Sequence, residues 1–338
     1  MIIDRYYYNR LSEIEKTIYK NIYSGCKEHR ELIRIEASSD QVMKHYKNVV
    51  DSFLFDNPLL YYVDQNEFDF KINERGEIYL VPQYFYNQEQ SKRIDKAIQN
   101  DVNRLIIENG FNQGSDSDKV RKVHDYFCQS IEYDYASNSS NPTKATVEAH
   151  SILGVFRLKK ARCEGIAKAV KVILNAVDVG CIFVSGKARN KTGKYELHGW
   201  NIVNIDKTPY HLDTTFDIGT SSNKNISYDY YNISDIQIKA DHVYDVKVPI
   251  CGSLDANYFV QNNLYFNSIK RIEAYIANEL KMGNRSIYFM VDSQIDIEKQ
   301  VQSLIQFGLE KLLCNGGKDV KCLRTINKFT GTCRLVFS

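Results

Sequence analysis

The chain has 338 residues, of which 43% are hydrophobic and 25% are charged, the balance of an ordinary folded protein with a sizeable core. Forty-four basic residues against 42 acidic ones leave a net charge of +2 and no long run of one sign, which argues against nucleic acid or a membrane surface as a partner. No apolar stretch approaches the roughly 18 residues of a membrane helix, and the N-terminus has no apolar signal-peptide core, so we expect a cytoplasmic protein.

The first 110 residues predict a structural lobe of mixed helices and strands. Ser12 and Glu15 form a capping-box pattern, and Gly110 is a typical residue at a helix C-terminus. We expect helices over 13–24, 39–56 and 89–108, and strands over 59–63, 67–72 and 77–86.

The polar, glycine-containing loop 110–118 is the expected boundary to a central domain over 111–250. A helix follows that carries Val120, Val123, His124, Phe127 and Ile131 on one side, and then a short helical segment over 147–156. His124 and His150 are expected to be ordinary structural histidines.

Residues 161–177 predict an amphipathic helix with Cys163 at its start. A helix N-terminus offers unpaired N–H groups and about half a positive charge, which stabilise a thiolate. Cys163 is therefore a candidate nucleophile, and the alternative is a small hydrophobic residue that caps a core helix. Glu164 is a candidate for substrate binding or shielding, or simply interacts favourably with the helix dipole.

Two strands over 195–205 and 209–216, joined by a tight turn at Asp206 and Lys207, predict an antiparallel hairpin. Pairing across a two-residue turn places His198 and Asp213 on one face, within reach of a side-chain hydrogen bond. Trp200 shares that face, where it either excludes water from the histidine or serves as a core aromatic residue.

A cysteine, a histidine and an acid in these places suit acyl transfer. The imidazole accepts the thiol proton, and the carboxylate orients the ring and stabilises the imidazolium. The other cysteines and histidines form no CxxC pair and no metal-ligand spacing, so we expect no metal, no cofactor and no disulfide framework. Free thiols fit a reducing compartment.

The segments ARCEGIAKA, LHGWNIV and YHLDTTFD follow one another with Cys163, His198 and Asp213 separated by 35 and 15 residues. They resemble the core of the transglutaminase-like superfamily, whose bacterial members carry C-x-G-[YF]-A, H-A-W-N and Y-H-x-D-x-T-[WF]-D motifs. The resemblance covers roughly 116–259. It implies an α+β, papain-like fold in which a cysteine-bearing helix packs on an antiparallel sheet, with Cys163 as nucleophile, His198 as base and Asp213 as orienting acid.

Three residues depart from the family pattern outside these three positions. Gly199 replaces an alanine, Ile166 a tyrosine and Phe216 a tryptophan. Since the glycine removes only a methyl group, we expect it to be tolerated.

Beyond the core, the pattern predicts a small α+β extension over 251–338. It comprises helices over 268–280 and 295–306 and strands over 287–291 and 332–337.

Two classes of function remain. The first is a cysteine-dependent enzyme that acts on glutamine side-chain amides or peptide bonds of a protein or peptide substrate through a thioester, with a transglutaminase, deamidase or protease-type outcome. The second is a catalytically silent module that binds protein or glycan. The complete set of cysteine, histidine and aspartate favours the enzyme.

Overall fold

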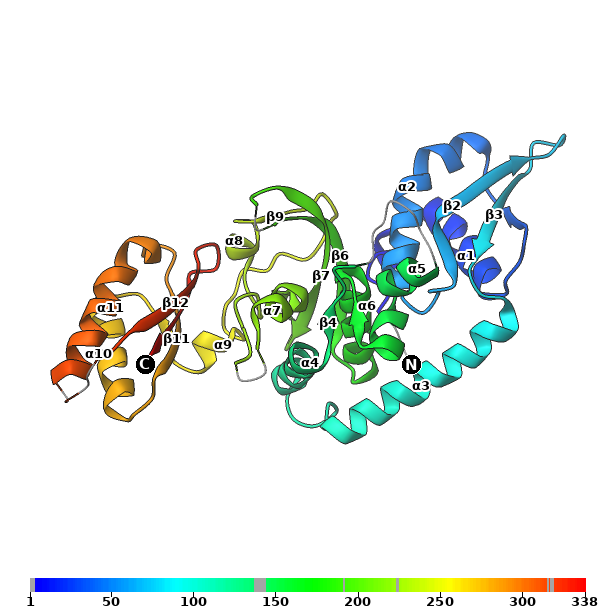
Figure 1. Ribbon diagram of the computed structural model, residues 1–338. Helices are drawn as coiled ribbons and strands as arrows, with labels where there is room; N and C mark the ends of the chain where they lie inside the picture. Colours follow the sequence, from blue (N-terminus) through cyan, green and yellow to red (C-terminus); the bar gives the residue numbers. More distant parts are fainter. Residues whose placement is uncertain (1–3, 137–143, 191, 223–224, 315, 317–318) are drawn as a thin grey trace. The chain divides into compact units, whose positions relative to one another are not determined.

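The computed structural model describes residues 4–136, 144–190, 192–222, 225–314, 316 and 319–338 (Figure 1). Contacts within the chain define two compact units, one comprising 1–207, 213–227 and 244–249 and the other comprising 208–212, 228–243 and 250–338. Both mix helices with largely antiparallel strands, which confirms the α+β class. The division into 1–110, 111–250 and 251–338 stays a prediction.

The N-terminal part of the first unit combines helices with a small antiparallel sheet. After a 3-10 turn over Tyr8–Arg10, its elements are α1 (Glu13–Lys27), β1 (Ile33–Ile35), α2 (Ser39–Asp56), β2 (Val63–Ile72), β3 (Ile78–Tyr84) and α3 (Gln88–Asn109). The strand order is β1-β3-β2. Both predicted caps are present: the Ser12 N–H donates to Glu15 Oε2 at 2.8 Å, and Gly110 ends α3 with a φ of 61°.

One strand predicted for this part is wrong, and one was not predicted. No strand covers 59–62, because turn hydrogen bonds from the Leu60 N–H to Asn57 O (3.0 Å) and from the Val63 N–H to Leu60 O (3.1 Å) engage the backbone there. β1 has only three residues, too few for an alternating pattern to be recognised.

The rest of the first unit surrounds one buried helix. Its elements are α4 (Asp116–Ser130), β4 (Glu132–Tyr133), α5 (Lys144–His150), a π-helical turn η2 (Gly154–Leu158), β5 (Lys160–Ala161), α6 (Cys163–Ala176), β6 (Gly180–Arg189), β7 (Tyr195–Ile205) and α7 (Thr214–Thr220). The helical segment expected over 147–156 is interrupted, since α5 stops at His150 and a turn at Ser151 precedes η2.

The predicted packing of a cysteine-bearing helix on an antiparallel sheet is confirmed. α6 contacts both β6 and β7, which pair antiparallel with Gly186 opposite His198 (Figure 1). Asn201 of β7 joins the layers, because its side-chain amide donates to Ala167 O of α6 at 2.9 Å and to Ile182 O of β6 at 3.2 Å.

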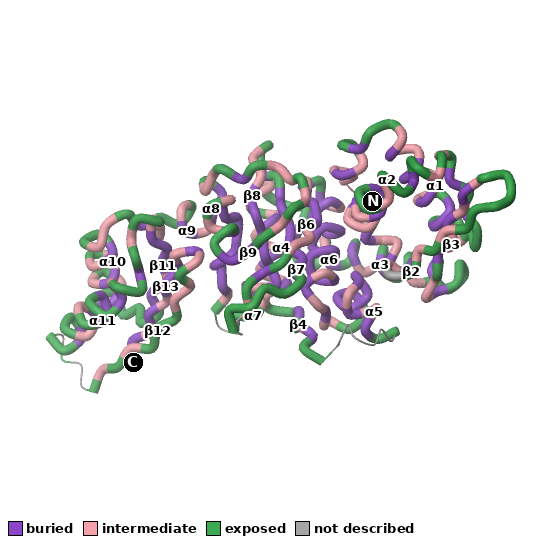
Figure 2. The backbone as a smooth tube through the Cα atoms, turned by 90° about the horizontal axis from the view of Figure 1, so that it is seen from above, coloured by how far each residue is buried: buried purple, intermediate pink, exposed green. Residues whose placement is uncertain are grey.

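α6 is buried along nearly its whole length (Figure 2). The sequence predicts an amphipathic helix that buries only its apolar side. Lys171 is fully buried, and its ammonium group donates to Asp4 O at 2.7 Å and to Cys181 O at 3.0 Å. These carbonyl groups satisfy a charged side chain that a periodicity pattern assigns to solvent.

The chain reverses after β7 as predicted, but the following strand is shorter. Asp206 and Lys207 both have positive φ values, 50° and 68°, which is typical of a two-residue hairpin turn. β8 (Thr208–Leu212) ends before Asp213, and the strand predicted to reach residue 216 is wrong. Asp213 instead caps α7, since its Oδ1 accepts a hydrogen bond from the Phe216 N–H at 3.1 Å.

The second unit contains the C-terminal α+β extension. Its remaining elements are α8 (Asp235–Ile238), β9 (His242–Val243), α9 (Tyr258–Gln261), β10 (Tyr265–Phe266), α10 (Ile269–Lys281), β11 (Ser286–Val291), α11 (Ile297–Cys314), β12 (Cys322–Asn327) and β13 (Thr332–Phe337). The sheet order is β10-β11-β13-β12, and a hydrophobic cluster joins α10 and α11 to it. The four predicted elements are present, and β10 and β12 were not predicted. Among the residues described, no helix is both long enough and apolar enough to cross a membrane.

Candidate active site

Local backbone contacts fix the start of α6, where Cys163 lies. β5 pairs with β4, so Ala161 lies beside Tyr133. Arg162, the residue before the helix, donates its N–H to Ala149 O at 2.8 Å and its guanidinium to Asp134 O at 2.9 Å. Cys163 therefore occupies the first helical position, where an N–H group has no acceptor within the helix.

Gly165 is required because another segment crosses α6 at that point. A Cβ atom at this position would lie 2.6 Å from Ser151 O and 2.7 Å from Ala149 O, distances that only glycine avoids. The crossing gives a physical reason for the glycine two residues after the cysteine.

His198 and Asp213 form the hydrogen bond that the sequence predicts, although Asp213 lies at a helix cap and not on a strand. Nε2 of His198 is 2.7 Å from Oδ2 of Asp213, whose side chain is fully buried. Cys163 is hydrogen-bonded to the imidazole of His198 and to the Gly199 N–H.

These hydrogen bonds shift the pKa values of Cys163 and His198 in opposite directions. Burial alone would raise the pKa of Cys163, but the hydrogen bond and the charge of His198, together with the Gly199 N–H, lower it. Burial alone would lower the pKa of His198, but the charge and hydrogen bond of Asp213 and the contact with Cys163 raise it to about 10. Both shifts favour the form of the pair in which the cysteine is a thiolate and the histidine an imidazolium.

Aromatic side chains cover the imidazole. The indole of Trp200 lies nearly parallel to the His198 ring, with centroids 6.0 Å apart and 19° between planes, and Phe216 packs on that ring at 4.8 Å. Trp200 is only 1% exposed and makes an edge contact with Tyr244 at 5.6 Å. It is thus a core aromatic residue that packs beside the imidazole.

Glu164 is engaged by side chains of its own chain. Its carboxylate lies 2.6 Å from the ammonium group of Lys168 and 3.5 Å from Nδ1 of His150. Burial would raise the pKa of Glu164, but the charge of Lys168 and the hydrogen bonds from His150 and Lys168 keep it well below its usual value. The predicted part of Glu164 in substrate binding or shielding stays a prediction, and His150 serves as its partner.

Gly199 avoids a clash next to the sulfur. A methyl group there would come within 2.6 and 2.8 Å of the Phe183 ring, which is 3% exposed. The glycine that was expected to be merely tolerated is therefore needed with this phenylalanine behind it.

A second set of the same residue types lies in the first unit, and the sequence did not reveal it. Nε2 of His124 is 3.1 Å from Oδ2 of Asp217 and 3.5 Å from the sulfur of Cys128. Nδ1 of His124 faces Asp125 Oδ1 at 3.2 Å. His124 and Asp217 are 93 residues apart in the chain, and the only sequence signal is the second aspartate of YHLDTTFD.

One group in the second unit has the composition of a metal site. Ligand atoms of His211, Asp235 and Cys251 lie within 4.8 Å of one another. However, His211 Nε2 bonds Asp235 Oδ1 at 2.9 Å, and Lys239 lies 3.2 Å from the other carboxylate oxygen. These contacts account for the histidine and the acid, and we assign no metal to the group.

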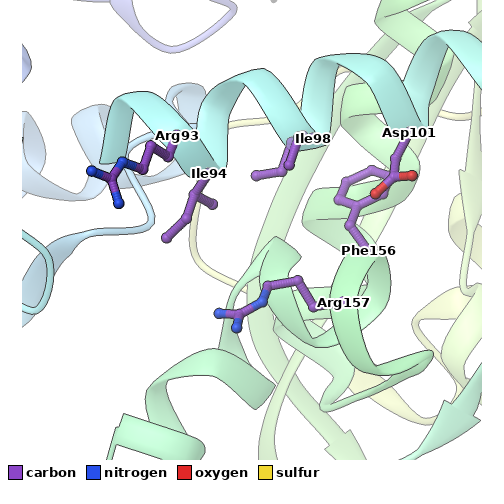
Figure 3. A pocket seen from close by; sticks show the side chains of 7 residues that line it. Arg93, Ile94, Ile98, Asp101, Phe156 and Arg157 are labelled. Atoms are coloured by element: carbon purple, nitrogen blue, oxygen red, sulfur yellow. The ribbon is translucent and has the colours of Figure 1, made fainter. Parts of the chain in front are cut away.

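A hollow of about 200 Å³ lies away from these clusters, between α3 and the π-helical turn (Figure 3). It is lined by Arg93, Ile94, Ala97, Ile98, Asp101, Phe156 and Arg157. None of these residues contributes to the cysteine site, so the hollow is not its substrate pocket.

Residues 107–214 match the model of one protein family, the transglutaminase-like superfamily. None of the curated proteins matches the chain. Among solved structures, the chain is similar to a TGase, at 19% identity and a TM-score of 0.31, over 54% of this chain and 48% of the other. It is also similar to a candidate cysteine protease from Cytophaga hutchinsonii, at 12% identity and a TM-score of 0.27, over 44% and 61%. The chain thus spans less than two thirds of either structure, and we draw nothing further from these likenesses.

Proposed function

We propose that the chain, whose residues 107–214 match the model of the transglutaminase-like superfamily, is a cysteine-dependent acyl-transfer enzyme of that superfamily. Cys163 is the nucleophile, His198 the general acid and base, and Asp213 the residue that orients the imidazole. The substrates are glutamine side-chain amides or peptide bonds of a protein or peptide.

The observation that supports this proposal most strongly is the set of hydrogen bonds that His198 makes. Asp213 Oδ2 lies 2.7 Å from Nε2, and Cys163 is hydrogen-bonded to the same imidazole. We place the sulfur at the opposite nitrogen, Nδ1. A histidine bonded in this way shuttles a proton to and from the sulfur while the carboxylate holds the ring. The lowered pKa of Cys163 supplies the thiolate before substrate arrives.

In the first half-reaction the Cys163 thiolate adds to the carbonyl carbon of the amide. The C–N bond then breaks, and the His198 imidazolium gives its proton to the leaving nitrogen, so that ammonia or an amine departs. Cys163 is left as a thioester and His198 as a neutral imidazole.

In the second half-reaction the neutral imidazole takes a proton from water or from an incoming amine. That nucleophile attacks the thioester, the C–S bond breaks, and the thiolate and the imidazolium are restored. Water gives hydrolysis, as in a deamidase or protease, and an amine gives the cross-linked product of a transglutaminase.

The start of α6 suits the negative oxygen of the tetrahedral intermediate. The Cys163 N–H lies at the first helical position, beside the sulfur that attacks and at the positive end of the helix dipole. We therefore place the oxyanion at the N–H groups of this first turn.

The test uses a peptide that carries an internal glutamine, with hydroxylamine as the amine. Mass spectrometry distinguishes three products: a hydroxamate and a glutamate, which both arise from a thioester of the glutamine side chain, and a cleaved peptide, which arises from a thioester of a backbone carbonyl. Cys163→Ala should abolish all three, and Cys128→Ala should abolish none. If wild-type protein forms no acyl adduct at Cys163 with any of a panel of glutamine peptides, and Cys163→Ala retains full biological activity, the domain is a binding module.

A further inference from the structure

We propose that His124 and Asp217 form a buried positioning pair that sets the orientation of Asp213, an inference that rests on the function proposed above. Both side chains are fully buried, and His124 Nε2 lies 3.1 Å from Asp217 Oδ2. The pair links α4 to α7, the helix that Asp213 caps.

α7 needs such an anchor because it is short. Seven residues make two turns, well below the roughly 12 residues at which an isolated helix becomes marginally stable. Its position is therefore set by contacts with the rest of the first unit, and α4 packs directly against it.

The anchor lies one helical turn from the triad acid. The Asp217 N–H donates to Asp213 O at 3.3 Å, so the two residues share a backbone hydrogen bond. The Asp213 carboxylate uses Oδ1 to cap the Phe216 N–H at 3.1 Å and Oδ2 to bind His198 at 2.7 Å. A shift of α7 along or about its axis therefore moves the oxygen that holds the imidazole.

Further contacts hold both members of the pair. Asp217 Oδ1 accepts a hydrogen bond from the Ser227 hydroxyl at 3.0 Å, and His124 Nδ1 lies 3.2 Å from Asp125 Oδ1. Burial would lower the pKa of His124, but Cys128 and the two carboxylates around it raise that pKa well above its usual value. This shift favours an imidazolium beside the Asp217 carboxylate, and a charged hydrogen bond between two buried side chains is strong and directional.

The second cysteine does not turn this cluster into another active site. The Cys128 sulfur and Asp217 both lie on Nε2 of His124, at 3.5 and 3.1 Å. A proton relay needs the sulfur and the acid on opposite nitrogens, which is the arrangement proposed above for His198. His124 is accordingly a positioning residue and touches no reacting atom.

The experiment compares Asp217→Asn with Asp125→Asn, which removes the other carboxylate partner of the same histidine but lies outside α7. The readout is the rate of iodoacetamide alkylation at Cys163 between pH 6 and pH 9, located by peptide mapping. The titratable groups around the sulfur, His198, Glu164 and Tyr133, are unchanged in both variants. We expect Asp217→Asn to raise the pKa of Cys163 by roughly one unit, which slows alkylation at pH 6 by up to about tenfold and leaves the rate at pH 9 unchanged. Asp125→Asn keeps the contact between His124 and Asp217 and should shift the profile less than Asp217→Asn does.

A double-mutant cycle with Asp213→Asn decides whether the pair acts through the triad acid. Once Asp213 is neutral, Asp217→Asn should have no further effect on the pH profile. The inference would be overturned if Asp217→Asn still slowed alkylation tenfold in the Asp213→Asn background. It would also be overturned if Asp217→Asn alone lowered the melting temperature but left the pH profile unchanged. If Asp213→Asn alone leaves the profile unchanged, the proposed function fails first, so the two failures are distinguishable.

Ser227→Ala provides a milder variant if Asp217→Asn does not fold. It keeps the ion pair and removes one hydrogen bond from Asp217. We expect a shift in the same direction, about threefold at pH 6, equivalent to roughly half a pKa unit. An unchanged profile in a folded Ser227→Ala protein, with Asp217→Asn unfolded, would reduce the pair to a purely structural contact.

Discussion

Two clusters in one unit contain a cysteine, a histidine and an aspartate, and we propose that only one of them catalyses acyl transfer. Around His198, Asp213 holds Nε2, and the proposed mechanism places Cys163 at the other nitrogen. Around His124, the acid and the sulfur share Nε2, and a second carboxylate holds Nδ1. The same residue types therefore give a proton relay in one place and an anchor in the other.

The comparison indicates that the histidine nitrogen that each partner contacts matters more than which residue types are present. Catalysis needs a histidine with one nitrogen reserved for the sulfur, at a helix start that stabilises the thiolate. Cys163 has both features, whereas Cys128 lies in the last turn of α4, where the helix dipole disfavours a thiolate. The predictions below, from the largest effect to the smallest, test this difference.

The largest effect is expected from Cys163→Ala, because it removes the only atom that can carry the thioester. Turnover should be abolished, while the melting temperature stays close to that of the wild type, since a small side chain replaces a thiol at a helix start. Cys128→Ala is the matched control and should keep turnover. Peptide mass spectrometry measures turnover in both variants. If Cys163→Ala and Cys128→Ala lose turnover equally, the two clusters do not differ in the proposed way.

Asp213→Asn should lower turnover by about 10⁴-fold, the loss seen for the comparable change in a serine triad, because an amide can hold the wrong imidazole tautomer. The same aspartate-to-asparagine change at position 217 should cost far less, since Asp217 acts only through the position of α7. The rate of hydroxamate formation measures both. A larger loss for Asp217 than for Asp213 would reverse their assigned roles.

Gly199→Ala should perturb the first cluster through packing. The added methyl meets the Phe183 ring at 2.6 Å, and overpacking of this kind costs about 1 to 3 kcal/mol. We expect a lower melting temperature and slower alkylation of Cys163, both relieved in the Gly199→Ala, Phe183→Leu double variant. If Gly199→Ala alone is as stable and as reactive as the wild type, the Phe183 ring moves aside without a measurable cost.

Trp200→Phe should have the smallest effect, because a smaller ring keeps an aromatic contact with His198. Aromatic pairs contribute about 0.5 to 1.5 kcal/mol, so turnover should fall by roughly two- to tenfold. Tyr244→Phe, which keeps the ring that contacts Trp200, is the control. A loss comparable to that of Asp213→Asn would instead make Trp200 a catalytic residue.

Local patterns predicted much of this arrangement. Capping residues and helical periodicity located α1, α3, α4 and α6, and the cysteine motif placed Cys163 at a helix start. The contact between His198 and Asp213 was also predicted, but on the assumption that Asp213 lies on the second strand of the hairpin. β8 ends one residue earlier, at Leu212. The aspartate reaches the histidine from a helix cap.

Long-range contacts between buried polar groups were not predicted. The burial of Lys171 was not predicted, and its ammonium group donates to carbonyl groups 167 and 10 residues away along the chain. His124 was taken as an ordinary structural histidine because its partner Asp217 lies far along the chain. Such pairs carry no local signal, since only the folded backbone brings their partners together.

The most direct test of the account is the pH dependence of alkylation at Cys163 and Cys128 in the same protein sample. Taking the ratio of rates at pH 8 and pH 6 for each cysteine removes the difference in exposure, since Cys163 is only 8% exposed and Cys128 is half-buried. A free thiol such as glutathione, added as a reference, should slow by nearly a hundredfold between these pH values. The account predicts that Cys163 slows by less than about threefold, because its thiolate is paired with the His198 imidazolium. It would be contradicted if Cys163 slowed as steeply as glutathione, or if Cys128 kept its rate better than Cys163.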